Sequence, residues 1–243
     1  MKLALFGHGA MGRLVEARAR ADGHETGLVV TSREAQASAE ELSELLRGHD
    51  AAIDFSVASA VLRNIEACAR AGVTLVEGTT GWHDRIEDAR RLVAEHNGSL
   101  VYGANFSVGV NLFYRIVGRA AELFAAVEGY EPFVEEAHHS RKRDAPSGTA
   151  LKLQTILRGA ARSEREVSVA STRAGHIPGT HRVGFDSAVD QITLTHVARS
   201  REGFVEGALL AARRMRGASG VFEFSDVLDR IISDRGGDDD STS

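Results

Sequence analysis

The sequence predicts an α/β protein in which a parallel sheet, covered by helices on both faces, is followed by a second α+β domain built on a mixed sheet. In the first hundred residues, short continuous apolar runs alternate with longer helical patterns, which is typical of strands buried on both faces. Beyond Val108 the pattern changes to a long amphipathic helix and separate strand-like runs, and all three prolines lie there. We therefore expect one domain over residues 1–107 with 202–243, and the other over residues 108–201.

The first predicted domain alternates strands with helices. Its strands are short and apolar, and they are expected at Lys2–Phe6, Glu25–Val30, Ala51–Phe55, Thr74–Glu77 and Leu100–Ala104. Apolar residues at helical spacing lie between them, at Ala10–Ala21, Leu42–Arg47, Ala58–Ala71 and Ile86–His96. Strands joined through helices in this way pair in parallel, because each crossover returns the chain to the same edge of the sheet.

The second predicted domain begins with one long helix, Val108–Ala126, whose apolar residues recur at helical spacing. Strands are then expected at Pro132–Ala137, Glu166–Ala170 and Val189–Val197, with a helix at Thr149–Ala161. Two terminal helices, Gly207–Met215 and Ser225–Ile232, are expected to return to the first domain. The final segment, Gly236–Ser243, is rich in Gly, Asp and Ser and is expected to be disordered.

The composition excludes several classes of protein. With 243 residues, 43% of them hydrophobic and 26% charged, the chain is long enough to bury a large core. A net charge of −5 disfavours a nucleic-acid binder. No run approaches the about 18 apolar residues of a membrane span, and the N-terminal apolar run is too short for a signal peptide. The single cysteine, Cys68, excludes an internal disulfide, so we expect a reducing, cytoplasmic compartment.

A glycine-rich loop, Gly7-His8-Gly9-Ala10-Met11-Gly12, matches the pattern G-x-G-x-x-G between the first strand and the first helix. The first glycine allows a tight turn, the second lets the backbone approach a pyrophosphate, and the third lets the helix lie close to the strand. Backbone N–H groups at the start of the helix can then hold the phosphates. A turn without a ligand is the alternative. The context favours a Rossmann-like dinucleotide-binding domain.

The end of the second predicted strand indicates which nicotinamide cofactor is bound. A carboxylate at this place commonly accepts hydrogen bonds from the ribose of NAD. Here the strand is followed by Thr31, Ser32 and Arg33, and the first acid is Glu34. Hydroxyls and a guanidinium suit a 2′-phosphate, which weakly favours NADPH over NADH. The alternative is that Thr31 or Ser32 caps the next segment and Arg33 is a solvated charge.

Two further turns follow predicted strands and are expected to face the cofactor. They are Gly78-Thr79-Thr80-Gly81 and Asn105-Phe106-Ser107. Ligands of open α/β sheets bind beyond the carboxyl ends of the strands, where both turns fall. Their hydroxyls, amides and one aromatic face can line a nicotinamide ring.

The segment from residue 135 to residue 150 carries the richest chemistry. His138, His139, Arg141, Lys142 and Arg143 lie within six residues, which predicts a pocket for an anion. A helix then starts at Pro-Ser-Gly-Thr, capped by Ser147 or Thr149, and its first N–H groups can hold a carboxylate. A histidine titrates near neutral pH and can donate a proton. Only three of the 29 basic residues are lysines, and an ammonium can lose a proton where a guanidinium cannot.

The residues of this segment allow three other interpretations. The histidines that would form a zinc site are His138, His139, His176, His181 and His196. Their spacing matches no usual ligand pattern, and we expect no metal. A solvated basic loop is the plainest alternative. A Ser–His hydrolase is disfavoured, because Ser147 lacks the strand–turn–helix context of a nucleophile.

At these residues the sequence resembles the 4-hydroxy-tetrahydrodipicolinate reductases of lysine biosynthesis, over nearly the whole chain. The most specific match is Glu136-Ala137-His138-His139, then Lys142, then Asp144-Ala145-Pro146-Ser147-Gly148-Thr149-Ala150. The other matching motifs are Asn105-Phe106-Ser107-Val108-Gly109-Val110-Asn111, Asp54-Phe55-Ser56, Gly78-Thr79-Thr80-Gly81 and Ser200-Arg201-Glu202-Gly203-Phe204. Departures from the family pattern fall near the adenosine. They are a phosphate loop one residue shorter, Val57 where some members carry a cation, and no acid directly after the second strand.

The resemblance implies NADH- or NADPH-dependent reduction of a cyclic imine dicarboxylate by a homotetramer, with the second domain carrying the substrate site and the subunit contacts. His138 would be the proton donor and Lys142 the second catalytic residue, which also binds substrate. The other implied substrate-binding residues are His139, Gly148, Thr149 and Arg201. The implied cofactor-binding residues are Gly7, His8, Gly9, Ala10, Met11, Gly12, Ser32, Arg33, Phe55, Gly78, Thr79, Thr80, Gly103, Ala104, Asn105 and Phe106. Another two-domain NAD(P)-dependent reductase and a non-enzymatic NAD(P)-binding redox sensor are the alternatives.

Overall fold

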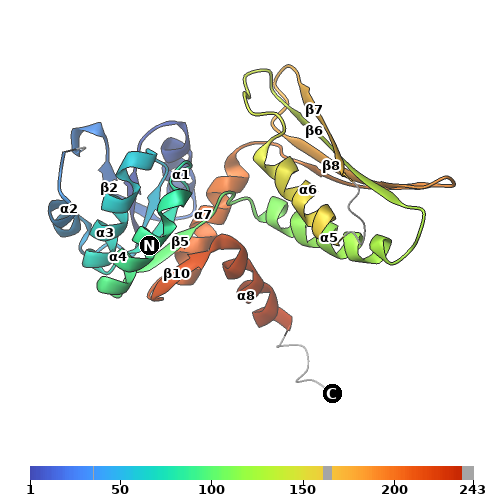
Figure 1. Ribbon diagram of the computed structural model, residues 1–243. Helices are drawn as coiled ribbons and strands as arrows, with labels where there is room; N and C mark the ends of the chain where they lie inside the picture. Colours follow the sequence, from blue (N-terminus) through green and yellow to red (C-terminus); the bar gives the residue numbers. More distant parts are fainter. Residues whose placement is uncertain (35, 161–165, 237–243) are drawn as a thin grey trace. The chain divides into compact units, whose positions relative to one another are not determined.

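The computed structural model describes residues 1–34, 36–160 and 166–236 (Figure 1). The chain divides into two compact units, Met1–Ser107 with Phe204–Ser243, and Val108–Gly203. The predicted fold class is confirmed, since the first unit contains a parallel six-stranded sheet and the second a mixed four-stranded sheet. Among the described residues, no helix combines the length and apolar character that crossing a bilayer requires.

The sheet of the first unit has the strand order β10-β5-β4-β3-β1-β2, and every pair is parallel. Its strands are β1 (Lys2–Phe6), β2 (Glu25–Val30), β3 (Ala51–Asp54), β4 (Thr74–Glu77), β5 (Ser99–Tyr102) and β10 (Gly220–Glu223). Its helices are α1 (Ala10–Ala21), α2 (Ala39–Leu46), α3 (Val61–Ala71), α4 (Ile86–Glu95), α7 (Glu202–Met215) and α8 (Phe224–Gly236). Three 3₁₀ turns add to these, η1 (Ser32–Glu34), η2 (Ala58–Ala60) and η3 (His83–Arg85).

The order of these strands fixes where a ligand can bind. From β1 the chain moves one way to β2, and it then returns past β1 to β3, β4 and β5. Right-handed crossovers therefore place α1 on one face and α2, α3 and α4 on the other. The latter three helices bury Leu42, Ile65 and Val93 against Phe6 and Leu75 of the sheet. The direction changes between β1 and β3, and the carboxyl ends of these two strands frame a crevice typical of ligand sites.

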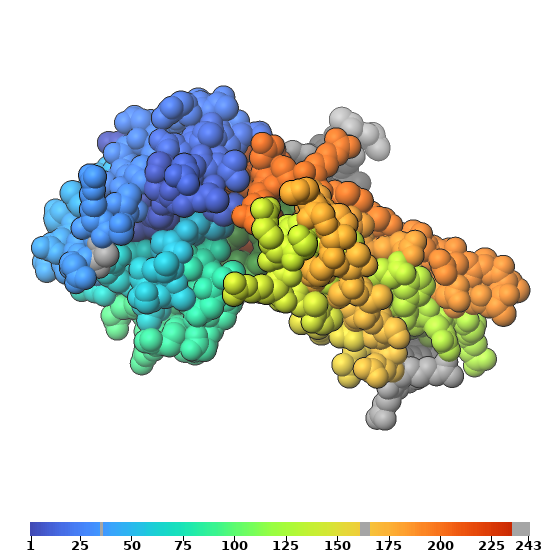
Figure 2. Space-filling model, turned by 90° about the horizontal axis from the view of Figure 1, so that it is seen from above, coloured from blue at the N-terminus to red at the C-terminus, as the bar shows by residue number. Residues whose placement is uncertain are grey.

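The second unit consists of a sheet with the order β7-β6-β8-β9 and two helices packed together on one face (Figure 1). Its elements are α5 (Val108–Ala125), β6 (Glu131–His138), α6 (Gly148–Ala160), β7 (Ser168–Arg173), β8 (Thr180–Asp186) and β9 (Gln191–Val197). Strand β6 runs parallel to β7 and antiparallel to β8. The register places Ser171, Glu136, His181 and His196 in one row across the four strands. The β8–β9 hairpin, orange in Figure 2, lies at the surface of this unit.

The structure contains two strands, β8 and β10, that the sequence did not predict. Strand β8 was missed because Arg182 and Gly184 interrupt its apolar run, although His181, Val183 and Phe185 alternate and are buried. Gly184 is required there, since a Cβ at this position would lie 2.2 Å from the ring of Phe133. Strand β10 was also missed, because four residues give too little pattern and its hydrogen bonds come from pairing with β5.

Other boundaries moved. The strand expected at Glu166–Ala170 is β7, which starts at Ser168 and ends at Arg173, because its partner β6 extends to His138 and fixes the length of the pair. Helix α7 begins at Glu202 rather than Gly207. Glycines near its start lower the helix propensity, so the first turns were not predicted, but they do not prevent the helix from packing. The predictions for Ala161 and for residues 237–243 lie outside the described residues, and Gly236 is the last residue of α8.

Candidate functional site

The glycine turn after β1 has a geometry that suits the binding of an anion. Gly7 adopts a φ of +87°, which favours glycine, and a Cβ at Gly12 would lie 2.1 Å from the Gly7 carbonyl oxygen. Helix α1 can therefore start directly against the strand exit. Gly9 is its N-cap residue and provides no side-chain cap, and the first turn carries no acid. The exposed N–H groups of this turn are open to a phosphate, while the side chain of His8 hydrogen-bonds Glu16 at 2.8 Å.

The exits of β1, β3 and β4 meet at the same edge of the sheet. A Cβ at Gly7 would lie 2.9 Å from the carbonyl oxygen of Phe55, and a Cβ at Gly78 would lie 2.2 Å from the Phe55 ring. Phe55 thus bridges two of the turns predicted to face the cofactor. Thr79 is buried at 7% exposure and hydrogen-bonds the ends of β3 and β4, whereas Thr80 is exposed.

The turn after β5 differs from expectation at its aromatic residue. Ala104 is exposed, and the Asn105 side chain accepts a hydrogen bond from the Ser107 backbone at 2.8 Å. The ring of Phe106 is only 2% exposed and packs on Phe224, with 4.8 Å between ring centroids. The expectation of an aromatic face at this turn is therefore corrected, because the ring fills the core, while Ala104 and the half-buried Asn105 remain accessible.

The end of β2 is organised around an acid. Both the backbone N–H and the hydroxyl of Thr31 donate to the Glu34 carboxylate, at 2.7 and 3.0 Å. These hydrogen bonds lower the pKa of Glu34. Ser32 and Arg33 are exposed in η1, and the Arg33 side chain forms no ion pair with another described residue. The Glu34 carboxylate is thus hydrogen-bonded within its own turn, and the exposed guanidinium of Arg33 belongs to the same turn.

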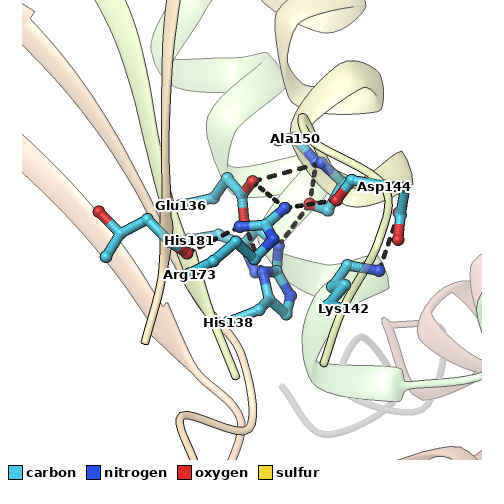
Figure 3. A network of polar contacts seen from close by, with 9 residues as sticks. Glu136, His138, Lys142, Asp144, Ala150, Arg173 and His181 are labelled. Carbon is cyan, nitrogen blue, oxygen red and sulfur yellow. Dashed lines mark hydrogen bonds and ion pairs between the residues drawn. The ribbon is translucent and has the colours of Figure 1, made fainter. Parts of the chain in front are cut away.

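In the second unit, the end of β6 carries a buried carboxylate–imidazole pair (Figure 3). Glu136 and His138 are two residues apart on the strand, so their side chains share a face, and Nδ1 of His138 hydrogen-bonds the carboxylate. Arg173, at the end of β7, completes the group with hydrogen bonds of 2.7 and 3.0 Å to both Glu136 oxygens. Arg173 also donates to the Asp144 carbonyl oxygen at 2.6 Å, which joins the loop after β6 to the sheet.

Burial and hydrogen bonding have opposite effects on the pKa values of Glu136 and of His138. Burial opposes ionisation of Glu136, but hydrogen bonds from Arg173, Ser171 and His138 outweigh it and lower the pKa of Glu136 to about 2. Burial also lowers the pKa of His138, although the Glu136 carboxylate partly offsets this. The pKa of His181 falls to about 4, mainly through burial and also through the neighbouring histidines. A new negative charge beside His138 would raise its pKa again.

The start of α6 lies beside this group. The Ser147 hydroxyl accepts from the Ala150 backbone at 3.3 Å and so caps the helix, one of the two caps that the sequence allows. The same hydroxyl lies 3.3 Å from Nε2 of His181, and the Ser147 N–H donates to Glu136 at 3.4 Å. Gly148 is exposed, and Thr149 hydrogen-bonds the hydroxyl of Tyr114. The network therefore fixes the first turn of α6 against β6 and β8.

The remaining predicted substrate residues are less closely joined. Lys142 Nζ lies 2.8 Å from the Asp144 carboxylate, with a quarter of its side chain exposed. The half-buried ring of His139 has an Nδ1 without a hydrogen-bond partner among the described residues. Arg201 is exposed, and among the described residues no hydrogen bond or ion pair joins it to the His138 group. The structure therefore places Lys142 in the loop that follows His138, close enough for its charge to act on the imidazole.

Three of these buried side chains are of types that can bind a metal ion. Ligand atoms of Glu136, His138 and His181 lie within 4.8 Å of one another. The guanidinium of Arg173 already neutralises the carboxylate, and a cation at that distance opposes a metal ion. The geometry favours an internal ion pair that orients His138.

Sequence reasoning missed the supporting residues Glu136, Arg173 and His181 as parts of the site. For Glu136 a signal was present, because residues two apart on a strand share a face. For Arg173 and His181 the sequence holds no such signal, since they lie 37 and 45 positions beyond Glu136 and only strand pairing brings them together.

Comparisons with known proteins give a consistent result. The model for the N-terminus of dihydrodipicolinate reductase matches residues 1–106, and the model for its C-terminus matches residues 109–228. The chain is 35% identical over 242 residues to 4-hydroxy-tetrahydrodipicolinate reductase of Christiangramia forsetii, covering 96% of this chain and 99% of that one. It is 33% identical over 235 residues to the enzyme of the same name from Neisseria gonorrhoeae, covering 89% and 86%.

Solved structures agree on the fold. A dipicolinate-bound dihydrodipicolinate reductase from Paenisporosarcina sp. TG-14 superposes with a TM-score of 0.77 at 19% identity, covering 92% of this chain and 97% of that one. A putative myo-inositol dehydrogenase from Sinorhizobium meliloti reaches 0.56 at 12% identity, covering 97% and 98%. At these identities the likeness concerns the fold alone.

Proposed function

The chain belongs to the dihydrodipicolinate reductase family, and from this premise we propose that it reduces 4-hydroxy-tetrahydrodipicolinate to tetrahydrodipicolinate in lysine and diaminopimelate biosynthesis. The reductant of the family is NADH or NADPH. The observation that carries the proposal is the His138 ring, which the Glu136 carboxylate orients beside the start of α6. Lys142, with its ammonium group, follows four residues later in the chain. This group offers a proton and a positive charge to a small dianion.

The first unit fits a nicotinamide dinucleotide at the carboxyl edge of its sheet. The supporting observation is the tight turn at Gly7 and Gly12, where a Cβ would meet backbone atoms within 3 Å, so that α1 starts directly at the end of β1. The residues that would hold the cofactor are Gly7, His8, Gly9, Ala10, Met11, Gly12, Ser32, Arg33, Phe55, Gly78, Thr79, Thr80, Gly103, Ala104, Asn105 and Phe106. When bound, the reduced nicotinamide supplies a hydride.

The proposed reduction adds one hydride and one proton and releases the 4-hydroxyl group as water, and His138 would supply the proton. Glu136 holds Nδ1, which leaves Nε2 as the atom that can reach a substrate. Gly179 helps to keep Nε2 open, because a Cβ there would lie 3.1 Å from this nitrogen. Burial lowers the pKa of His138. Binding of a dianion would raise this pKa and load the proton only when substrate is present.

The substrate carboxylates need cations and N–H donors. Lys142, His139 and Arg201 would supply the side-chain donors, and Gly148 and Thr149 the N–H groups at the start of α6. The Lys142 ammonium lies 2.8 Å from the Asp144 carboxylate. Because its side chain is flexible, it can move from Asp144 to a substrate carboxylate. Lys142 would thus both bind the substrate and stabilise charge during reduction.

A weak preference for NADPH is part of the proposal. Glu34 is occupied by Thr31, so it is less able to accept from a ribose hydroxyl. Arg33 is exposed beside it and suits a 2′-phosphate.

We further propose a cytoplasmic homotetramer with its subunit contacts on the second unit. The hairpin of β8 and β9 exposes Val189, Ile192 and Val197, at 88%, 43% and 59%, which is costly in water. Cys68 is buried and free, in keeping with a reducing compartment. Light scattering of the purified chain would give the number of subunits.

The decisive test is oxidation of NADPH and NADH by the purified chain with freshly prepared 4-hydroxy-tetrahydrodipicolinate. Turnover with this substrate, and none with a panel of aldehydes, is the expected result. Turnover with an aldehyde alone would assign the chain another reductase activity. Tight cofactor binding without turnover on any of these substrates would indicate a sensor.

A further inference from the structure

Two carboxyl groups, Asp54 and Glu77, are buried side by side beneath the proposed cofactor turns. They end the parallel strands β3 and β4 and are register partners in that pair. Asp54 is 0% exposed and Glu77 is 1% exposed. Within residues 1–34, 36–160 and 166–236, neither forms an ion pair with a cationic side chain. Burying two acids without a cation is costly, and the reduction proposed above uses neither.

Their hydrogen bonds distinguish the two groups. Asp54 accepts from the Ser56 backbone N–H at 2.7 Å and from Asn64 Nδ2 at 2.6 Å. The Thr79 hydroxyl also donates to Asp54, at 3.3 Å. Three donors stabilise a charged carboxylate. At Glu77 the Thr79 N–H donates to Oε1 at 2.6 Å, while Oε2 is buried without a partner among the described residues.

A single proton resolves this arrangement. Placed on Oε2 of Glu77, it would turn the unpartnered oxygen into a donor, with Asp54 as its acceptor. Burial, and then the charge of Asp54, raise the pKa of Glu77 well above its ordinary value. The other titratable neighbours are Cys68 of α3 and Tyr102, the register partner of Glu77 on β5. Burial and both acids raise the pKa of the Cys68 thiol, so it stays neutral.

The acid pair acts on the turn through one residue. Thr79 donates its backbone N–H to Glu77 and its hydroxyl to Asp54, so both acids hold the same residue. Its neighbour Gly78 lies against the Phe55 ring, at the edge where β1, β3 and β4 end. The conformation of the turn therefore depends on the pair.

We propose that Asp54 and Glu77 share one buried proton and, through Thr79, hold the Gly78–Thr80 turn in the conformation that binds the reduced cofactor. The inference rests on the proposed function. Both acids are positioning residues, because they act through Thr79. Loss of the shared proton would place two negative charges together in the core, and their repulsion would release Thr79. Cofactor affinity then falls as pH rises, while the chemical step at His138 is not directly affected.

The test measures NADPH affinity by the fluorescence of the bound nicotinamide, on the full chain from about pH 6 to about pH 10. Three variants are compared with the unaltered chain. Glu77→Gln keeps an acceptor for Thr79 and a donor for Asp54 but cannot titrate. Glu77→Leu removes both. Glu87→Gln makes the same change on α4, where the side chain is 83% exposed.

We expect the dissociation constant of the unaltered chain and of Glu87→Gln to rise about tenfold across this range, and that of Glu77→Gln to stay constant. Glu77→Leu should bind about tenfold more weakly at every pH, with kcat at saturating cofactor within about twofold. A merely structural role would not produce this split between affinity and kcat, or its rescue by glutamine.

Two results would overturn the inference. One is a pH-independent affinity in the unaltered chain, and the other is a Glu77→Gln curve that follows the unaltered one. If Glu77→Leu fails to fold by circular dichroism, Glu77→Gln alone decides between these outcomes. Failure of every form, including Glu87→Gln, to bind NADPH or NADH would overturn the proposed function itself, and the inference with it.

Discussion

Glu136 and His138 meet side by side on one face of β6, with the carboxylate of the first bound to Nδ1 of the second. The same alternation sends Glu135 to the other face, where it pairs with Arg182. One strand thus carries an acid that orients an imidazole and, beside it, an acid in an ordinary surface ion pair. This contrast offers a matched control for the role of the buried carboxylate.

Glu136→Gln is expected to lower kcat roughly 10²-fold, because a neutral amide no longer holds the imidazole in one tautomer or stabilises its charged form. Since the Glu136 charge raises the His138 pKa, the fall of kcat/KM with rising pH should move to lower pH in the variant. Steady-state kinetics across pH would measure both effects. Glu135→Gln should leave them unchanged, and equal losses in the two variants would contradict the orienting role.

His138→Gln is expected to lower kcat roughly 10² to 10⁴-fold, the usual contribution of a positioned proton donor. The far-ultraviolet circular dichroism spectrum should not change, since glutamine can keep a hydrogen bond to Glu136. His176→Gln, at an exposed position of the same unit, is the control. An unchanged kcat in His138→Gln would remove His138 from the chemistry.

Lys142→Ala is expected both to raise the substrate KM and to lower kcat, each roughly tenfold or more, because a charge that binds the dianion also stabilises it during reduction. Lys152→Ala, on the exposed side of α6, should match the unaltered chain. A rise in KM with kcat preserved would make Lys142 a binding residue only.

Arg33→Ala is expected to raise the KM for NADPH roughly tenfold and to leave that for NADH unchanged, because only NADPH carries the 2′-phosphate. Arg47→Ala, next to α2 and two-thirds exposed, controls for the loss of a surface charge. Equal changes for both cofactors would refute the preference.

The free energy of unfolding is expected to decrease as the pH is lowered, because His181 is buried in its neutral form. Its pKa is about 4 in the folded chain against an ordinary 6.5, so the folded state holds the neutral form. The contribution is fully present above about pH 6.5 and is lost as pH falls to about 4, by roughly 3 kcal/mol. Burial lowers the pKa of His138 and His196 too, so part of the loss remains without His181.

Urea unfolding between these pH values would measure this loss. His181→Gln should flatten the dependence, whereas His176→Gln should not. Identical slopes in the unaltered chain and in His181→Gln would show that another group carries the effect.

Much of the fold was predictable because its signals are local. The turn from Gly7 to Gly12 lies between a short apolar run and an amphipathic helix, and the steric needs of each glycine concern neighbours in the chain. The parallel sheet follows from repeated strand–helix units. The candidate site was predictable where its residues are adjacent, as in the segment from His138 to Thr149.

Strand pairing decided the rest. Arg173 meets Glu136, and His181 joins the same row, only because β7 and β8 lie on either side of β6 in one register. Asp54 and Glu77 become a pair for the same reason. The order of residues along the chain thus predicts most of the helices and strands and the residue types at their ends, although not β8 or β10. Only the folded structure decides which charges share a buried site, because burial and the distances between residues remote in the sequence set their electrostatic energies.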